Sequence, residues 1–197
     1  MVMVHSAGDQ ICSTGRIDRA GSRAAGRPHY TDSMTCPSLA VTSGPLALER
    51  VVGHVELAGR DKGEGCGAVC SFFGVVRATH QHRRVRYLEY EAHDRLAIRA
   101  FEIIVAEVAE TWPLATVAIH HRVGRVEIGE ASVIVAAASA HRDESFRVCR
   151  YGIERVKQIA PVWKHEFFED GESWVEGPLA DPANENLRRE AMERACA

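Results

Sequence analysis

Two stretches of the chain repeat apolar residues at steps of three and four, which is the spacing of one helix face. The first helix is predicted from Asp94, a capping residue, to about Thr111. The second is predicted from Asp143, also a cap, to Pro161, which must end it because proline lacks a backbone N–H. The predicted buried stripes are Leu96, Ala100, Ile103, Ile104 and Val108 in the first helix, and Phe146, Cys149, Ile153, Val156 and Ala160 in the second.

Shorter apolar or alternating runs predict strands. These strands cover residues 67–77, 85–92, 117–122, 131–140, 162–168 and 173–176. The first two strands are expected to pair, Gly124 to form a turn, and Asp170-Gly171-Glu172 to join the last two strands in a hairpin. Residues 46–57 fit a strand or a short helix equally well. Because strands and helices alternate irregularly, the pattern favours an α+β domain with antiparallel strands and two main helices.

The chain divides into three predicted regions. Residues 1–40 are rich in Ser, Gly, Arg and Ala and show no apolar period, so we expect a disordered extension. Met34 is an alternative start of translation. Residues 41–180 hold the predicted elements and form a single domain, and residues 181–197 form a polar tail or a short helix.

Composition excludes several classes of protein. An apolar fraction of 46% and a charged fraction of 26% are those of a soluble globular protein. The net charge of −3 gives no reason to expect nucleic acid or a membrane as partner, and no apolar run is long enough to span a bilayer. The six cysteines show no C-x-x-C spacing and no secretory signal accompanies them, so we expect reduced thiols in a cytoplasmic protein.

Basic residues gather at four predicted element ends. These clusters are Arg77, His120-His121-Arg122, His141-Arg142, and Lys157 with Lys164. Arginine offers a planar fork that suits phosphate or carboxylate, whereas the pKa of lysine shifts easily on burial. If the clusters converge, they suit an anionic small molecule that needs both binding and proton transfer. The alternative is scattered surface charge.

The two lysines flank the predicted helix end. Lys157 lies in the last turn of the second helix, and Lys164 lies on the strand that follows Pro161. The turn at the proline can aim both ammonium groups at one spot. In the alternative interpretation both lysines are solvated, and Lys157 complements the negative end of the helix dipole.

Other chemistries lack their motifs. His80-x-His82 and His120-His121 have no companion ligands at zinc spacing, so no metal is expected. The chain has no G-x-S-x-G, no Walker A loop, and no G-x-G-x-x-G that opens a helix. Cys66, Cys70 and Cys149 lie on apolar elements and are interpreted as core residues.

Six motifs, taken in order, resemble one known family. They are Phe72-x-Gly74-x-Val76-Arg77, Trp112-Pro113-Leu114, His121-Arg122-Val123-Gly124, Ser139-Ala140-His141-Arg142, Lys157-x-x-Ala160-Pro161-x-Trp163-Lys164 and Trp174-Val175-Glu176. This set resembles the large, catalytic subunit of molybdopterin synthase over residues 46–176. The resemblance implies an α/β-hammerhead fold and a sulfurtransferase of molybdenum cofactor biosynthesis.

The resemblance also implies a reaction and its partners. The enzyme converts cyclic pyranopterin monophosphate to molybdopterin by installing a dithiolene. The sulfur arrives as a thiocarboxylate on the C-terminal Gly-Gly of a small ubiquitin-like subunit. The large subunit is a homodimer at the centre of a heterotetramer, and no cofactor is needed because the sulfur is imported.

Site residues follow from the matched motifs. Lys157 and Lys164 would be catalytic, facing the thiocarboxylate and the reacting carbons. Arg77, His141 and Arg142 would hold the substrate phosphate and pterin. The full implied substrate-binding set is Val75, Val76, Arg77, His141, Arg142, Lys157, Lys164, His165 and Glu166, with Phe72, Arg122 and Trp163 in support.

The chain departs from the family pattern at two places. Val75 stands where many members have a basic or polar residue, and Gly177-Pro178 stands where an arginine often follows. The positive charge of residues 81–86 is a candidate replacement for the missing phosphate contact.

Two other classes of function stay open at this stage. A non-catalytic module of the same fold could dock a ubiquitin-like tail, although it would have no reason to keep both lysines. A nucleic-acid binder could use Arg83-Arg84-Val85-Arg86, although it would need an extended basic face with exposed aromatic side chains.

A chain that starts at Met34 is expected to fold and to bind its small subunit as the full chain does, because residues 1–33 lack an apolar period. Thermal unfolding and co-purification with the partner measure this. A shortened chain that unfolds, or that no longer holds the partner, would contradict the prediction.

Overall fold

The computed structural model describes residues 38–175, 177 and 181–197, all of which belong to one compact unit, Cys36–Ala197. Its helices are α1 Leu48–Arg60, α2 Asp94–Thr111, α3 Arg142–Ile159 and α4 Glu185–Cys196. Its strands are β1 Leu39–Thr42, β2 Ala68–Val75, β3 Thr79–His80, β4 Arg83–Ala92, β5 Thr116–Arg122, β6 Gly124–Glu127, β7 Ala131–Ser139, β8 Val162–Phe168 and β9 Gly171–Val175. The disorder predicted for residues 1–40 falls outside the described residues up to residue 37, and at its end it was wrong, because Leu39 and Ala40 begin β1.

The strands form two sheets. The first has the order β1-β5-β7-β2, and the second has the order β3-β4-β8-β9 with β6 also paired to β4. All pairs are antiparallel except β1 with β5. The α+β class with antiparallel strands is therefore confirmed, and α2 and α3 are the two main helices predicted.

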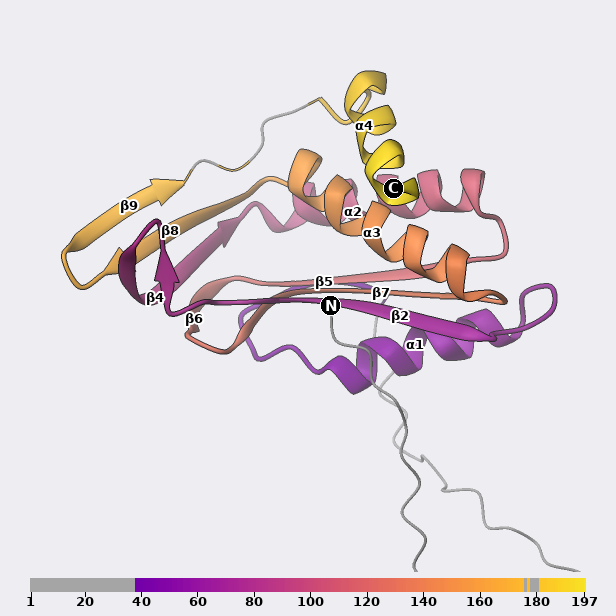
Figure 1. Cartoon of the computed structure of the whole chain (residues 1–197), viewed down its shortest axis with the longest axis horizontal. Coiled ribbons are helices and arrows are strands. Elements are labelled where there is room, and N and C mark those ends of the chain that lie inside the picture. Colours follow the sequence, from indigo (N-terminus) through magenta and orange to yellow (C-terminus); the bar gives the residue numbers. More distant parts are fainter. Residues whose placement is uncertain (1–37, 176, 178–180) are drawn as a thin grey trace, which may run out of the picture. The chain divides into compact units, whose positions relative to one another are not determined.

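Helices cover both faces of the first sheet (Figure 1). Helix α1 packs on one face, where Val51 and Val55 meet Ala118 and Ile134. Helices α2 and α3 cover the other face, and α4 packs against α3. Strand β7 is buried along its whole length because both of its faces are covered.

The second sheet extends beyond the first, at the end where α3 leads into β8 (Figure 1). Strand β4 lies at its centre and pairs with both β8 and β6. A smaller core holds this sheet together, formed by Val76, Val85, Leu88, Val126 and Phe168. Gly124 has a φ of 76°, and the chain passes there from the first sheet into the second.

Several local predictions were correct. The hairpin at Gly171 joins β8 to β9, with Phe168 paired to Gly171. Residues 46–57, left open between strand and helix, form most of α1. Residues 185–196 form the helix of the polar C-terminal region, and Ala191 and Ala195 enter the main core, so this helix belongs to the domain.

Other predictions were wrong. Strand β2 pairs with β7, and not with β4, which lies in the second sheet. Asp94 and Asp143 are in the first helical turns, whereas the N-caps are His93 and His141. Leu96 is 55% exposed because it lies one position before Ala97, which takes its place in the core. Strand β1 and the short strand β3 were not predicted.

A buried ion pair ties α3 to α2 and to the segment before α4. Arg155 is fully buried and donates to both carboxylate oxygens of Glu107, at 2.6 and 2.8 Å. The Tyr151 hydroxyl donates to the same carboxylate, and burial beside it raises the pKa of Tyr151. Arg155 also donates to the Pro182 carbonyl at 3.1 Å, so one guanidinium links three parts of the fold.

Arg155→Met is expected to lower the free energy of unfolding by about 3–5 kcal/mol, because it leaves the Glu107 carboxylate buried without its cation. Arg99→Met is the control, since Arg99 pairs with Glu102 on the exposed face of α2 and should change stability by less than about 0.5 kcal/mol. Urea unfolding measures both, and equal small changes would contradict the structural role of Arg155.

Candidate functional site

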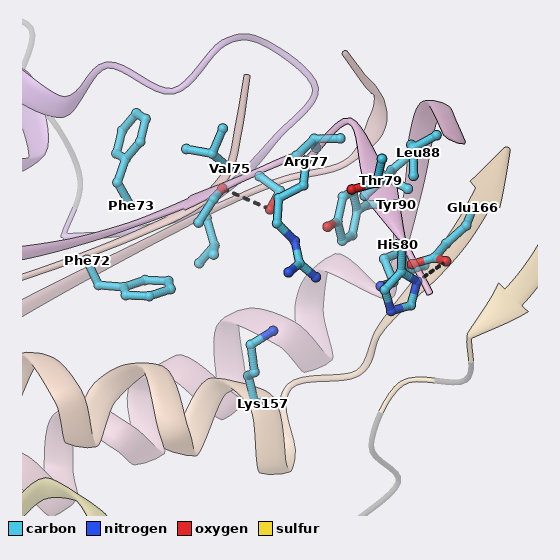
Figure 2. Close-up of a pocket in the computed structure, with 16 residues that line it drawn as sticks. Phe72, Phe73, Val75, Arg77, Thr79, His80, Leu88, Tyr90, Lys157 and Glu166 are labelled. Carbon is cyan, nitrogen blue, oxygen red and sulfur yellow. Dashed lines mark hydrogen bonds and ion pairs between the residues drawn. The ribbon is translucent and has the colours of Figure 1, made fainter. Parts of the chain in front are cut away.

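A cavity of about 350 Å³ opens where β2, β4, β8 and the end of α3 meet. Charged and polar groups line it together with apolar side chains from the first sheet (Figure 2). The lining residues are Phe72, Phe73, Gly74, Val75, Val76, Arg77, Thr79, His80, Val85, Leu88, Tyr90, Ser132, Val133, Lys157, Lys164 and Glu166. No helix of residues 38–175 and 181–197 has the length and apolar character needed to cross a bilayer.

Both predicted catalytic lysines line this cavity. Helix α3 ends at Ile159, and β8 begins at Val162, so the chain turns within two residues at Ala160 and Pro161. This turn brings Lys157 from the helix and Lys164 from the strand to the same wall. The predicted convergence of the two lysines is confirmed.

Glu166 holds Lys164 in place. Its carboxylate, 4% exposed, accepts from Lys164 Nζ at 2.5 Å and contacts His80 Nδ1 at 2.7 Å. Burial raises the pKa of Glu166, but the hydrogen bonds from Lys164 and His80 outweigh it, so that pKa lies below the usual 4.5. The carboxylate is therefore ionised and offsets the charge of Lys164.

The Lys157 ammonium forms no ion pair with any residue that the structure describes. Solvent reaches the side chain, yet the surrounding pocket wall removes much of its hydration, and this lowers its pKa. The charge of Lys164 lowers the pKa further, while Glu154 raises it. A lowered pKa makes the Lys157 ammonium easier to deprotonate than an ordinary lysine, which suits a group that exchanges a proton.

Arg77 is exposed at the rim of the cavity, just beyond β2. Figure 2 shows its guanidinium directed toward the Lys157 side of the cavity. No ion pair of Arg77 occurs among the residues that the structure describes, so its fork is available to an anion.

A second chamber of about 200 Å³ lies beside the cavity and shares its lysines. Its lining residues are Tyr90, His121, Val133, Ile153, Val156, Lys157, Ala160, Val162, Lys164, Val175 and Gly177. The lining is mostly apolar on the α3 side. Lys157 and Lys164 therefore stand between two hollows, one more polar and one more apolar.

His121 is a buried member of the second chamber. Burial lowers its pKa to about 4, and the Lys157 charge adds to this, while the contact with the Arg122 carbonyl acts in the opposite direction. Its Nδ1 lies 2.8 Å from that carbonyl oxygen, and the Tyr90 ring packs against it edge-on at 5.3 Å. The imidazole is neutral at pH 7.

Not all predicted site residues meet in this cavity. His141 and Arg142 are exposed at the N-terminal end of α3, where they form long ion pairs with Glu64 and Asp143. Fifteen residues separate Arg142 from Lys157, a rise of about 22 Å along the helix. Within one chain these two residues lie far from the lysines, and their role in binding phosphate stays a prediction.

The remaining predicted residues divide between the cavity and its surroundings. Phe72, Val75 and Val76 line it directly. His165 points to the other face of β8, where its ring stacks on Trp174 with centroids 4.3 Å apart. Trp163 lies outside the lining.

Arg122 also lies outside the lining, and it pairs with Glu130 at 2.9 Å. Pro178, which stands where an arginine often follows in the family pattern, falls outside the described residues.

The sequence did not lead us to assign His80 or Tyr90 to the site, and it offered His121 only as part of the basic cluster His120-His121-Arg122. His80 arrives through the β3–β4 hairpin, whose turn residues Gln81 and His82 have φ angles of 48° and 63°. Such angles strain residues other than glycine, and strained turns are often kept where they present a functional group. The sequence signal that could have identified His80 is the basic, histidine-containing loop of residues 78–84.

Within the arginine-rich segment, Arg83 is held by the protein itself, whereas Arg84 and Arg86 are exposed. Arg83 pairs with Asp170 at 2.8 Å and covers the Phe168 ring at 3.7 Å. Arg86 packs beside Tyr87. No group of three or more His, Cys, Asp or Glu side chains within the described ranges is arranged to hold a metal ion.

The family model described as "MoaE protein" matches residues 41–159. The chain belongs to the MoaE family. A relative from Halalkalibacterium halodurans, named "Molybdopterin synthase catalytic subunit", is 39% identical over 142 residues, which cover 72% of this chain and 87% of the relative.

Two solved structures resemble this MoaE-family chain. The molybdopterin synthase structure from Staphylococcus aureus aligns with a TM-score of 0.65 at 34% identity, covering 71% of this chain and 98% of the other. A complex of subunits 1 and 2 of the molybdopterin-converting factor from Helicobacter pylori aligns with a TM-score of 0.58 over 71% and 90% of the chains. Its identity of 20% makes this a likeness of fold alone.

The buried His121 predicts an acid-sensitive part of the stability. The unfolded chain takes up this proton near pH 6.5 and the folded chain near pH 4, so the unfolded state binds more protons between these values. Stability therefore falls as the pH drops from about 6.5 to about 4, by about 3 kcal/mol for this residue. The difference in unfolding free energy between the native chain and His121→Phe should shrink by that amount from pH 7 to pH 4, and a pH-independent difference would contradict it.

Proposed function

We propose that this MoaE-family chain is the catalytic subunit of a molybdopterin synthase and acts as a sulfurtransferase. It transfers sulfur from the C-terminal thiocarboxylate of a small ubiquitin-like subunit to cyclic pyranopterin monophosphate. The product is the dithiolene of molybdopterin. The observation that carries the proposal is the placement of Lys157 and Lys164 on one wall between two adjoining hollows.

The chemistry of the two reactants suits this wall. The thiocarboxylate and the substrate phosphate are both anionic, so cations fixed in advance bind and orient them. Lys157, whose pKa is lowered, can give or take a proton, whereas Lys164 is held by Glu166 and supplies fixed charge. Arg77 at the rim suits the phosphate.

Each of the two hollows suits a different reactant. The larger one carries Arg77, His80 and the phenylalanines of β2, which fits a flat, charged pterin. The second is smaller and mostly apolar, and the partner's Gly-Gly tail would enter it, since glycine needs little space. Both ligands then meet at the lysines.

A second copy of the chain would complete the phosphate site. His141 and Arg142 lie at the far end of α3 in one chain, so they can contact the substrate beside Lys157 only from a partner chain. The proposed homodimer supplies that partner. We propose further that the reaction needs no resident cofactor, since the sulfur is imported, and the cytoplasmic location stays a prediction.

Lys157→Ala is expected to lower turnover by about two to four orders of magnitude, the usual loss for a missing general acid or base. Lys164→Ala should lower it severely too. Lys→Arg should not rescue Lys157, since a guanidinium does not exchange a proton near neutral pH, nor Lys164, since the planar guanidinium does not replace a compact ammonium. Conversion of the cyclic phosphate substrate with thiocarboxylated small subunit measures this.

Arg150→Ala is the matched control, because Arg150 is an exposed cation on the same helix outside both hollows. It should retain native turnover. Lysine variants as active as this control would refute the catalytic role, and would favour a binding module that only docks the small subunit.

Mixed dimers test whether Arg142 of one chain acts together with Lys157 of the other chain. Lys157→Ala and Arg142→Ala chains, each deficient alone, should regain about a quarter of native activity when mixed equally, because half of the dimers are mixed and each restores one site. If mixing restores nothing while mixed dimers are detected by native mass spectrometry, the two residues do not act across a dimer.

A further inference from the structure

His121 is a buried histidine at the site to which the proposed function gives no task. It lies on β5 and is 6% exposed, and it lines the second chamber together with Lys157 and Lys164. Its neighbour His120 lies on the opposite face of the same sheet, because side chains alternate along a strand. The chain therefore offers two adjacent buried histidines, of which one reaches the site.

The hydrogen bond of His121 fixes where its lone pair lies. A backbone carbonyl can only accept, so Nδ1, at 2.8 Å from the Arg122 oxygen, carries the hydrogen. The ring is neutral at pH 7, since its pKa is about 4, and Nε2 therefore presents a lone pair. Nε2 makes no hydrogen bond with any other described residue, and the edge contact with Tyr90 holds the ring in place.

The other candidates near the lysines are less suited to accept a proton. The Glu166 carboxylate is bonded to both Lys164 and His80. An ammonium group has no lone pair, so Lys157 can accept a proton only after it has released its own. Among the described residues that line the second chamber, His121 is the one side chain with a neutral basic nitrogen.

The proposed reaction needs such an acceptor. The thiocarboxylate sulfur first displaces an oxygen substituent from the pterin side-chain carbon: a C–S bond forms, a C–O bond breaks, and the electron pair leaves with the oxygen. The partner is then joined to the pterin as an acyl–sulfur ester. Water must then add to the acyl carbon: a C–O bond forms, the acyl C–S bond breaks, and the electron pair stays on the sulfur. The products are the partner's carboxylate, the pterin thiolate and two protons, with no change of oxidation state.

We propose that His121 Nε2 accepts the proton of the water that cleaves this acyl–sulfur bond. The inference rests on the proposed function and adds a residue and a step to it. The positive lysines oppose an imidazolium in the empty site, but the bound phosphate and acyl oxygen offset that charge. The base therefore gains strength only when both ligands are in place.

The test compares His121→Phe with His120→Phe, the same change one residue away on the opposite face. In a single turnover, His121→Phe should form the covalent partner–pterin adduct and cleave it at least about a hundredfold more slowly than the native chain. Intact-protein mass spectrometry follows the adduct. His120→Phe should cleave it at the native rate.

Cleavage by His121→Phe within about threefold of native would overturn the proposal. So would slow turnover without accumulation of the adduct, since that places the defect before cleavage. A native chain that forms no product at all would instead refute the proposed function, so the two failures are distinguishable.

His121→Ala provides a second test that does not depend on how phenylalanine packs. Added imidazole should restore adduct cleavage, because it can occupy the vacated space and supply a lone pair. Pyrrole has the same size and no basic nitrogen, so it should not restore cleavage. Equal rescue by both would show a role in packing only, and rescue by neither would also overturn the proposal.

Discussion

The repulsion between two ammonium groups on one wall is the constraint on which the site depends. Lys157 and Lys164 are brought together by the short turn at Pro161, and the charge of Lys164 disfavours the charge of Lys157. Glu166 resolves this by pairing with Lys164 at 2.5 Å, and His80 contacts the same carboxylate. Lys164 is held by this carboxylate, while the pKa of Lys157 is lowered first by burial and then by the charge of Lys164.

The rest of the fold serves this arrangement. Lys157 reaches the cavity only if the C-terminal end of α3 is held in position. The buried Arg155–Glu107 pair anchors that helix to α2. Strand β8 carries both Lys164 and Glu166 on one face, and its register with β4 fixes their position beside the cavity. The second sheet thus carries the Glu166 carboxylate that pairs with Lys164, while the first sheet supplies apolar side chains that line the cavity.

Features that depend on neighbours in the chain could be predicted from the sequence. Features that depend on contacts between distant segments could not. The apolar spacing of the helix and its end at Pro161 are local signals, and together they placed Lys157 in the last helical turn. The pairing of β2 with β7 was missed, since a buried apolar strand fits either sheet equally well. His80 was missed because its hairpin uses Gln81 and His82 in place of the usual glycine or asparagine.

The central claim is that Lys157 and Lys164 form one binding wall for the partner's tail. The chain's lysines are Lys62, Lys157 and Lys164, and Lys62 donates to the Ala115 carbonyl away from the cavity, so it is an internal control. The direct measurement is lysine-selective NMR while a small subunit with an intact Gly-Gly end is added. The signals of Lys157 and Lys164 should shift together and that of Lys62 should not; a shift of neither site lysine, or of only one, would contradict the account.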